Sequence, residues 1–177
     1  MRVTKFTMKV ILKNLTNFVL FGLVLVVAGN LFAQQTVKVS PANPEAGKTC
    51  IYKLEFTLPD SLPPKGVVVV VFPADFDLSG VTIGASSKIK GGFFTFVVGK
   101  EVLMIRKGKG EPHKAGEKVD AWLSAVKNPN SATLTYSTQV YIYEDGDVIA
   151  SQIKAKTYKA KTNPKVLSGT FALTAKK

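Results

Sequence analysis

Apolar and polar residues alternate along much of the chain after residue 35. The clearest run covers residues 50–58, where every second residue is apolar or a cysteine: Cys50, Tyr52, Leu54, Phe56 and Leu58. Three of the four residues between them are polar, and Ile51 is the exception. A period of two predicts a β-strand with one buried face, so Cys50 should point inward.

Another segment, residues 67–72, is continuously apolar, with five valines and a phenylalanine. Such a run predicts a central strand covered on both faces. The Glu-Asp-Gly-Asp sequence at 144–147 predicts a hairpin turn, because glycine tolerates positive φ. Further strands are predicted at residues 36–40, 81–83, 93–98, 102–106, 119–125, 132–143, 148–158 and 166–175.

A sandwich of about eight or nine of these short strands is expected, because turn signals occur about every ten residues, and they predict a single all-β domain. No helical pattern follows residue 35, so we expect an antiparallel β-sandwich over residues 36–158. Residues 159–177 are interpreted as a basic linker followed by a candidate C-terminal strand.

The N-terminal segment predicts export. Residues 1–17 carry four basic side chains and no acid, and residues 18–28 are an apolar run. This order is typical of a signal peptide, here residues 1–33 with cleavage after Ala33, or less favourably after Ala28. The run is too short for a typical spanning helix, although an uncleaved anchor is the alternative. We expect a secreted or cell-surface protein, extracellular or periplasmic, with no membrane span after cleavage; either Met1 or Met8 is its start.

The charge is unevenly distributed. The whole chain has a net charge of +12, but residues 36–150 hold 13 basic and 12 acidic side chains, whereas residues 151–177 hold seven lysines and no acid. The chain has only two arginines, Arg2 and Arg106, which argues against nucleic-acid binding in an exported protein. An acidic envelope polysaccharide is a better candidate partner. Alternatively, the lysines protect an exposed strand edge.

Several turn and core motifs resemble a known family. They are Asn43-Pro44-x-x-Gly47, the strand at 52–58, the run at 67–83 that passes through Phe-Pro, and the segment 116–129 that ends in Asn-Pro. Together they resemble the immunoglobulin-like modules of bacterial and archaeal secreted and cell-surface proteins, over residues 37–152. The resemblance implies an immunoglobulin-like sandwich with a structural or adhesive role, and says little about a ligand. The chain departs from the family pattern in having a single module and a basic tail.

Catalytic chemistry is poorly represented. One histidine and one cysteine exclude a His/Cys zinc cluster and an internal disulfide. His113 lies in a glycine-rich loop, so no triad is expected, and we predict a non-enzyme without a cofactor. Asp75, Asp77 and Ser79 match the opening of a calcium loop, but the twelfth position is Ser86 rather than glutamate. Asp side chains that bond local backbone amides are the preferred interpretation.

Two sets of residues are candidate contact sites. An exposed Trp122 with Tyr141 and Tyr143 would form a sugar-binding platform, with Lys154 and Lys156 as further contacts. Alternatively, the aromatics cover a second apolar layer or an interface. The C-terminal segment is a candidate for strand donation to a neighbouring copy, through Val166, Leu167, Phe171 and Leu173.

Head-to-tail donation of this kind builds a filament, whereas the alternative is that the strand folds back on its own domain. We therefore expect a non-catalytic structural or adhesive protein whose partners are copies of itself or other surface proteins. A carbohydrate- or envelope-polymer-binding module is the alternative.

Overall fold

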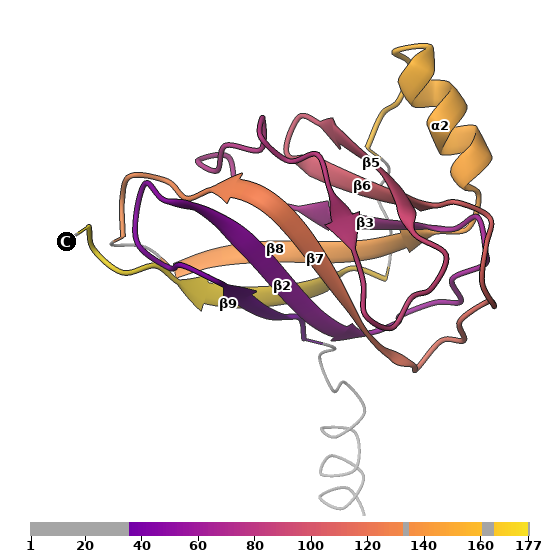
Figure 1. Cartoon of the computed structure of the whole chain (residues 1–177), viewed down its shortest axis with the longest axis horizontal. Coiled ribbons are helices and arrows are strands. Elements are labelled where there is room, and N and C mark those ends of the chain that lie inside the picture. The colour runs from indigo at the N-terminus through magenta and orange to yellow at the C-terminus, as the bar shows by residue number, and fades with distance from the viewer. Residues whose placement is uncertain (1–35, 133–134, 161–164, 177) are drawn as a thin grey trace, which may run out of the picture. The chain divides into compact units, whose positions relative to one another are not determined.

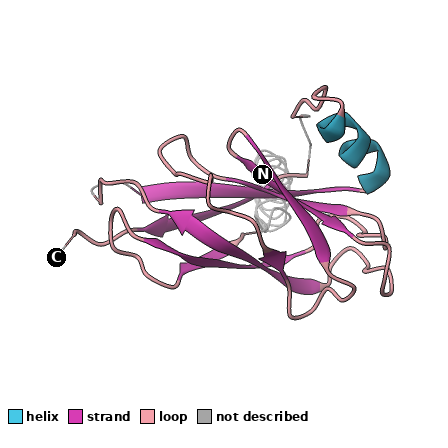
Figure 2. Cartoon of the chain, turned by 45° about the horizontal axis from the view of Figure 1, so that its top comes forward, coloured by secondary structure: helices cyan, strands magenta, loops and turns pink. Residues whose placement is uncertain are grey.

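The computed structural model describes residues 36–132, 135–160 and 165–176. Within these ranges the chain forms nine strands and one helix, and the strands make two antiparallel sheets packed face to face (Figures 1 and 2). This confirms the prediction of a single all-β, immunoglobulin-like sandwich. The four-stranded sheet has the order β1 (Lys38–Pro41), β2 (Thr49–Thr57), β7 (Lys118–Lys127), β4 (Gly84–Ala85), and the five-stranded sheet β5 (Phe93–Val98), β6 (Glu101–Arg106), β3 (Val67–Val71), β8 (Thr135–Tyr143), β9 (Leu167–Ala172).

Strand β2 shows how the alternating pattern builds the core. Tyr52, Leu54 and Phe56 are buried between the sheets, and the intervening side chains face outward. Cys50 points to the same side and is half-buried. The Tyr52 ring packs edge-on against Phe72 and other aromatic rings of the core. The predicted buried face of this strand is therefore confirmed.

Strand β3 lies in the middle of the five-stranded sheet, between β6 and β8. Val68 and Val70 belong to the core between the sheets, whereas Val67 and Val69 belong to a second cluster on the outer face of this sheet. All four valines are fully buried. The prediction of a central strand covered on both faces is confirmed.

The cover on the outer face is a helix, α2 (Gly146–Lys154), which Figure 2 shows beside one end of the sandwich. The predicted hairpin turn at 144–147 and return strand at 148–158 are therefore wrong. The Asp145 side chain caps the helix by accepting hydrogen bonds from the N–H groups of Asp147 and Val148. Ile149 and Ile153, four residues apart on one helical face, pack with the outer cluster.

The C-terminal strand β9 completes the chain's own five-stranded sheet. It pairs with β8 from Thr135↔Ala172 to Val140↔Leu167. On its other side the Val37 N–H donates to the Ser168 carbonyl at 3.0 Å. Three of the four residues proposed for strand donation, Leu167, Phe171 and Leu173, are buried in this position, and Val166 is 38% exposed.

Two sequence-based predictions fall outside the described residues. These are the signal peptide at 1–33 and residues 161–164 of the basic linker. In the described ranges, no helix has the length and apolar character needed to cross a membrane.

Candidate functional site

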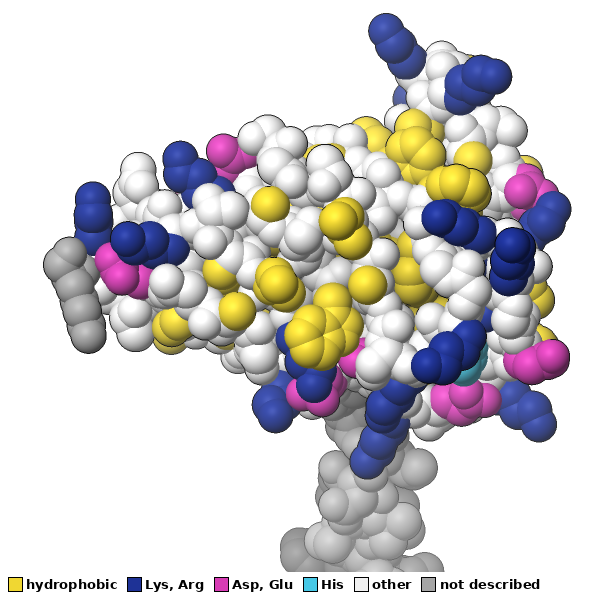
Figure 3. Space-filling model, in the orientation of Figure 1, with side chains coloured by type: hydrophobic (Ala, Val, Ile, Leu, Met, Phe, Trp, Pro, Cys, Tyr) yellow, Lys and Arg dark blue, Asp and Glu magenta, His cyan; other side chains and the backbone are white. Residues whose placement is uncertain are grey.

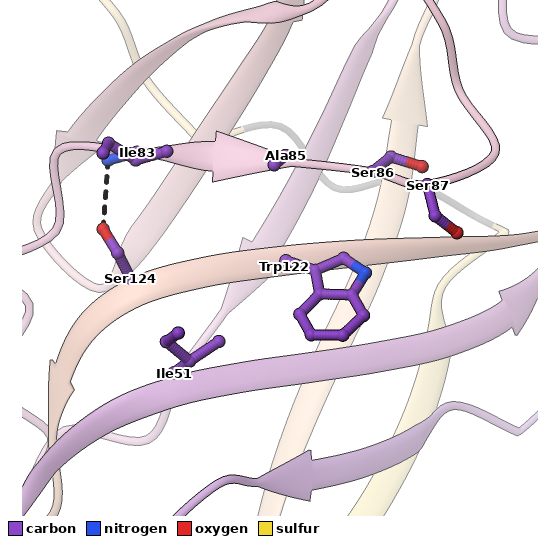
Figure 4. A pocket seen from close by; sticks show the side chains of 7 residues that line it. All are labelled: Ile51, Ile83, Ala85, Ser86, Ser87, Trp122 and Ser124. Atoms are coloured by element: carbon purple, nitrogen blue, oxygen red, sulfur yellow. Dashed lines mark hydrogen bonds between the residues drawn. The ribbon is translucent and has the colours of Figure 1, made fainter.

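Trp122 lies on the outer face of the four-stranded sheet. Its neighbours in β7, Ala121 and Leu123, are buried, so alternation directs the indole outward, where the residue is 37% exposed. Ile51 from β2 and Ile83 beside β4 are exposed on the same face. Seven residues line a shallow hollow of about 470 Å³ here, which we call the Trp122 face (Figure 4): Ile51, Ile83, Ala85, Ser86, Ser87, Trp122 and Ser124.

The Trp122 ring is held in one orientation although it is partly exposed. Its Nε1–H donates to Asp120 Oδ2 at 2.8 Å. The Lys53 ammonium lies 5.3 Å from the indole ring centre, a cation–π distance, and Lys53 is itself paired with Glu55 at 2.9 Å. An ordered exposed ring loses little conformational freedom on binding, so this arrangement favours association.

Asp120 organises the loop beside the indole. Besides Trp122, its carboxylate accepts hydrogen bonds from the Ser86 hydroxyl at 2.7 Å and from the hydroxyl and N–H of Ser87 at 2.7 and 2.9 Å. Burial raises the pKa of Asp120, but the hydrogen bonds from Trp122, Ser87 and Ser86 outweigh it and lower the pKa below its ordinary value. The carboxylate is therefore ionised at neutral pH, and it fixes both the indole and the loop.

The walls of the hollow are almost entirely apolar. The Ser86 and Ser87 hydroxyls turn toward Asp120, and the Ser124 hydroxyl accepts the Ile83 N–H at 3.3 Å. Carbon atoms are left to line the hollow, and Figure 3 shows hydrophobic side chains spread over this face with charged ones toward its borders. A sugar needs polar groups placed to bond its hydroxyls. This surface is better suited to apolar side chains of another protein.

The predicted sugar platform is not assembled. Tyr141 and Tyr143 lie in β8 on the outer face of the other sheet, where they belong to the cluster beneath α2. Tyr141 is 4% exposed, and its hydroxyl donates to Glu101 at 2.5 Å. The two tyrosines therefore belong to a second apolar layer, which was the alternative interpretation of the sequence. Trp122 is therefore on the opposite side of the sandwich from both of them.

The two lysines predicted as ligand contacts lie at the end of α2. Lys154 is the last residue of the helix, and Lys156 follows its C-cap with a φ of 58°. Both therefore belong to the five-stranded sheet's side of the molecule, with the tyrosines. The structure places neither lysine beside Trp122.

The calcium-like sequence forms a local turn. Asp77 Oδ1 accepts the Ser79 N–H at 2.9 Å. This is the local bond to a backbone amide that was preferred to metal binding as the interpretation of the sequence. Asp75 is exposed. In the part of the chain that the structure describes, no three His, Cys, Asp or Glu side chains are grouped so that they could hold a metal ion.

Cys50 and His113 are too far apart to act together. Cys50 lies near the start of β2. His113 forms a hydrogen bond with the Glu117 side chain at 2.8 Å, and the Glu117 carbonyl accepts the N–H of Leu58, just beyond the other end of β2. Eight residues of strand separate these points by roughly 25 Å. Burial also raises the pKa of the Cys50 thiol, and this disfavours the nucleophilic thiolate.

Sequence reasoning identified Trp122 as an outward aromatic but missed Ile51, Ile83 and Asp120. Ile51 had a signal, because it is the apolar residue in the outward phase of β2, next to Lys53 and Glu55. Asp120 also had one, since it lies two residues before Trp122 on the same side of β7. Ile83 joins them only through the pairing of β4 with β7.

Comparisons with known proteins find structural likenesses but no sequence family. No family model matches the chain, and no curated protein matches its sequence. Among solved structures, BslA, described as a bacterial hydrophobin, has a TM-score of 0.46 and 11% identity over 80% of this chain and 98% of its own. A cohesin module from a Clostridium perfringens family 33 glycoside hydrolase has a TM-score of 0.45 and 8% identity over 80% and 98%.

A third solved structure, the N-terminal domain of a Streptococcus gordonii adhesin, has a TM-score of 0.43 and 16% identity over 80% of this chain and 33% of its own. All three TM-scores are too low to support an argument about function. The description of the chain therefore rests on its own structure, which is an immunoglobulin-like antiparallel β-sandwich with an apolar face around Trp122.

Proposed function

We propose that this protein is a non-catalytic structural or adhesive component of the cell surface that binds a protein partner through the Trp122 face. The observation that carries the proposal is an exposed tryptophan fixed by Asp120 and Lys53 in an apolar hollow. The signal peptide expected at 1–33 supports a surface location.

The two outer faces of the sandwich differ in a way that supports this assignment. Helix α2 covers the apolar outer cluster of the five-stranded sheet. No element of the described chain covers the Trp122 face in this way, and Ile51 and Ile83 are 46% and 61% exposed. A central tryptophan surrounded by aliphatic side chains is the composition typical of a binding hot spot, where one truncation costs about 2–4 kcal/mol.

The test measures binding of labelled residues 34–177 to cell envelopes of the source organism. Trp122→Ala and Ile83→Ser should each weaken binding by about tenfold or more, the equivalent of 1.4 kcal/mol. Val148→Ser is the matched control, because Val148 is 45% exposed on α2, on the other side of the sandwich. Prior protease treatment of the envelopes should lower binding of the wild type to the level of the Trp122→Ala variant. Unchanged binding of both Trp122-face variants would contradict the proposal.

Self-assembly by exchange of β9 is a second candidate. The feature that favours it is the six-residue ladder between β8 and β9, because an identical strand from a neighbour could form the same bonds. Gln139 and Ser168 are directly paired across this ladder. A disulfide between Gln139→Cys and Ser168→Cys, in a Cys50→Ser background, would lock β9 onto its own domain.

Electron microscopy and gel filtration then distinguish the outcomes of this lock. Fibres that the wild type forms, and that the locked monomer forms only after reduction, would support exchange. A wild type that stays monomeric at every concentration would exclude it.

A further inference from the structure

Arg106 joins two loops at one end of the sandwich. The residue is 2% exposed, and its guanidinium donates to carbonyl oxygens, with no carboxylate partner among its described contacts. Nη2 bonds the carbonyls of Lys90 and Lys109, both at 3.4 Å, and that of Glu111 at 2.8 Å. Nη1 bonds the carbonyls of Leu62 at 3.0 Å and Pro63 at 2.8 Å. The loops at 86–92 and 107–111 are therefore held together at their backbones.

Two glycines allow this close approach. Gly91 has a φ of +96°, and a Cβ at this position would lie 2.0 Å from the Lys109 carbonyl oxygen. Gly110 has a φ of +85°, and its Cβ would lie 3.0 Å from the Lys90 carbonyl oxygen. Because the carbonyls of Lys90 and Lys109 turn inward to Arg106, both residues present exposed side chains from adjacent points of the surface.

The two loops carry four exposed lysines, which we call the lysine cluster: Lys88, Lys90, Lys107 and Lys109. No carboxylate of the described residues lies within ion-pairing distance of these four ammonium groups, whereas Lys65, Lys53 and Lys38 elsewhere are paired. Figure 3 shows many Lys and Arg side chains at the end of the sandwich that carries these loops, with some Asp and Glu side chains among them. The buried Arg106, which is bonded only to carbonyls in the described structure, adds a fifth positive charge beneath them.

An aromatic ring lies beside the cluster. Phe94, in the edge strand β5, is 55% exposed, and the Lys107 ammonium lies 4.9 Å from its ring centre. Unpaired like charges on a small area raise the local positive potential and attract polyanions. An exposed ring next to them offers a flat apolar surface to a ligand that is already held by charge.

We propose that the lysine cluster and Phe94 form a binding site for a linear acidic polysaccharide. The carboxylates of successive sugars pair with the lysines, and the apolar face of one sugar ring stacks on Phe94. Lysine ammonium groups are point charges without the planar fork that favours phosphate, and Arg106 is buried. One exposed ring also does not provide the series of stacking surfaces that single-stranded nucleic acids use. The lysine cluster borders the Trp122 face, because Ser86 and Ser87 belong to the same loop as Lys88, but it shares no residue with that face or with the basic tail.

The experiment titrates residues 34–177 with polygalacturonate as the acidic probe and amylose as the neutral one. The Lys90→Gln/Lys109→Gln variant should bind polygalacturonate at least about tenfold more weakly at low salt. These substitutions leave the backbone carbonyls that Arg106 holds. Lys154→Gln/Lys156→Gln is the matched control with the same net charge, and its affinity should be unchanged. Phe94→Leu should weaken binding about threefold without changing its salt dependence.

Several results would overturn this inference. They are equal losses in the two lysine variants, comparable binding of amylose, or tighter binding of a single-stranded oligonucleotide of equal charge than of polygalacturonate. Trp122→Ala should retain full affinity for polygalacturonate. This result keeps the outcome distinct from that of the proposed protein-binding face, whose failure would leave the polysaccharide site intact.

Discussion

Substitution of Asp120 by Asn tests how the Trp122 face is built. The carboxylate accepts five hydrogen bonds, from the hydroxyls of Ser86 and Ser87, the N–H groups of Ser87 and Lys88, and Trp122 Nε1. An asparagine amide has one acceptor oxygen, and its NH₂ group would face donors. At least two bonds to a charged group are lost, and Asp120 itself is only 3% exposed.

The expected loss of stability follows from these contacts. Hydrogen bonds to charged groups contribute about 1.5–3 kcal/mol each, and the amide retains part of this, so we expect a net loss of about 3 kcal/mol. A domain of this size has a free energy of unfolding of about 5–15 kcal/mol, and the variant should therefore still fold. With a urea m-value of about 2 kcal/mol/M, the unfolding midpoint should fall by about 1.5 M.

Tryptophan fluorescence is a direct assay, because Trp122 is the chain's single tryptophan. In the variant the native emission should shift, since the indole loses its partner. The effect should also depend on pH. The folded pKa of Asp120 lies below its ordinary value of 3.8, so its contribution is complete above about pH 4 and is lost as the pH falls through the folded pKa.

An Asp120→Asn variant with the wild-type urea midpoint and emission spectrum would refute this reasoning. So would a difference between the two proteins that stays constant through acid pH. Asp120→Glu is a useful companion, because it keeps the charge but displaces the carboxylate. It should restore the acid dependence without restoring the full stability.

Three further predictions concern other parts of the domain. Arg106→Met should lower the thermal midpoint, measured by calorimetry, by about 10 °C, because five hydrogen bonds to carbonyls are lost. Arg106→Lys should not restore the midpoint, because an ammonium group lacks the planar set of donors of the guanidinium. Burial, and then the bond to Glu101, raises the pKa of Tyr141 and of Tyr158, so both phenols should stay protonated at about pH 11. Their share of the tyrosinate absorbance, measured as the difference from a Tyr141→Phe/Tyr158→Phe variant, should increase only when the protein unfolds. Val69→Asp places a carboxylate at a fully buried position, so protease-resistant secreted protein should disappear; normal amounts would contradict the assignment of β3 as a central strand.

The sandwich could be predicted because its strands are defined by local patterns. The alternation in β2 identified the buried side chains, and the five valines of β3 required cover on both faces. Prolines and glycines marked the turns, as at Gly99 between β5 and β6. Each of these signals depends on residues a few positions apart, which sequence alone shows.

Helix α2 could not be predicted from the spacing of apolar residues, because its first residues fit the strand period of two as well as the helical period of 3.6. The Asp145-Gly146 pair is typical of a hairpin turn, and Val148 and Ile149 are good strand formers. The competing signals were the capping carboxylate of Asp145 and the spacing of Ile149 and Ile153. Packing on the outer cluster decides between them, and this is tertiary information.

The candidate site was predictable only in part for a similar reason. The outward direction of Trp122 followed from alternation in one strand. Its neighbours come from β2 and from the segment around β4, about 70 and 40 positions earlier, and strand pairing brings them together. The tyrosines that sequence grouped with Trp122 are on the other sheet, because sequence alone does not assign β7 and β8 to different sheets.

The way the two ends of the domain meet has a mechanical consequence. Residues 36–46 and 168–174 run in the same direction side by side, with parallel bridges at Thr36↔Ser168 and Glu45↔Thr174. Backbone bonds of 2.8–3.0 Å join these segments. A force that pulls residue 36 and residue 176 apart acts along the segments, so the bonds carry the load in shear and must break together. A domain clamped in this way resists stretching far better than one whose end strands unzip bond by bond.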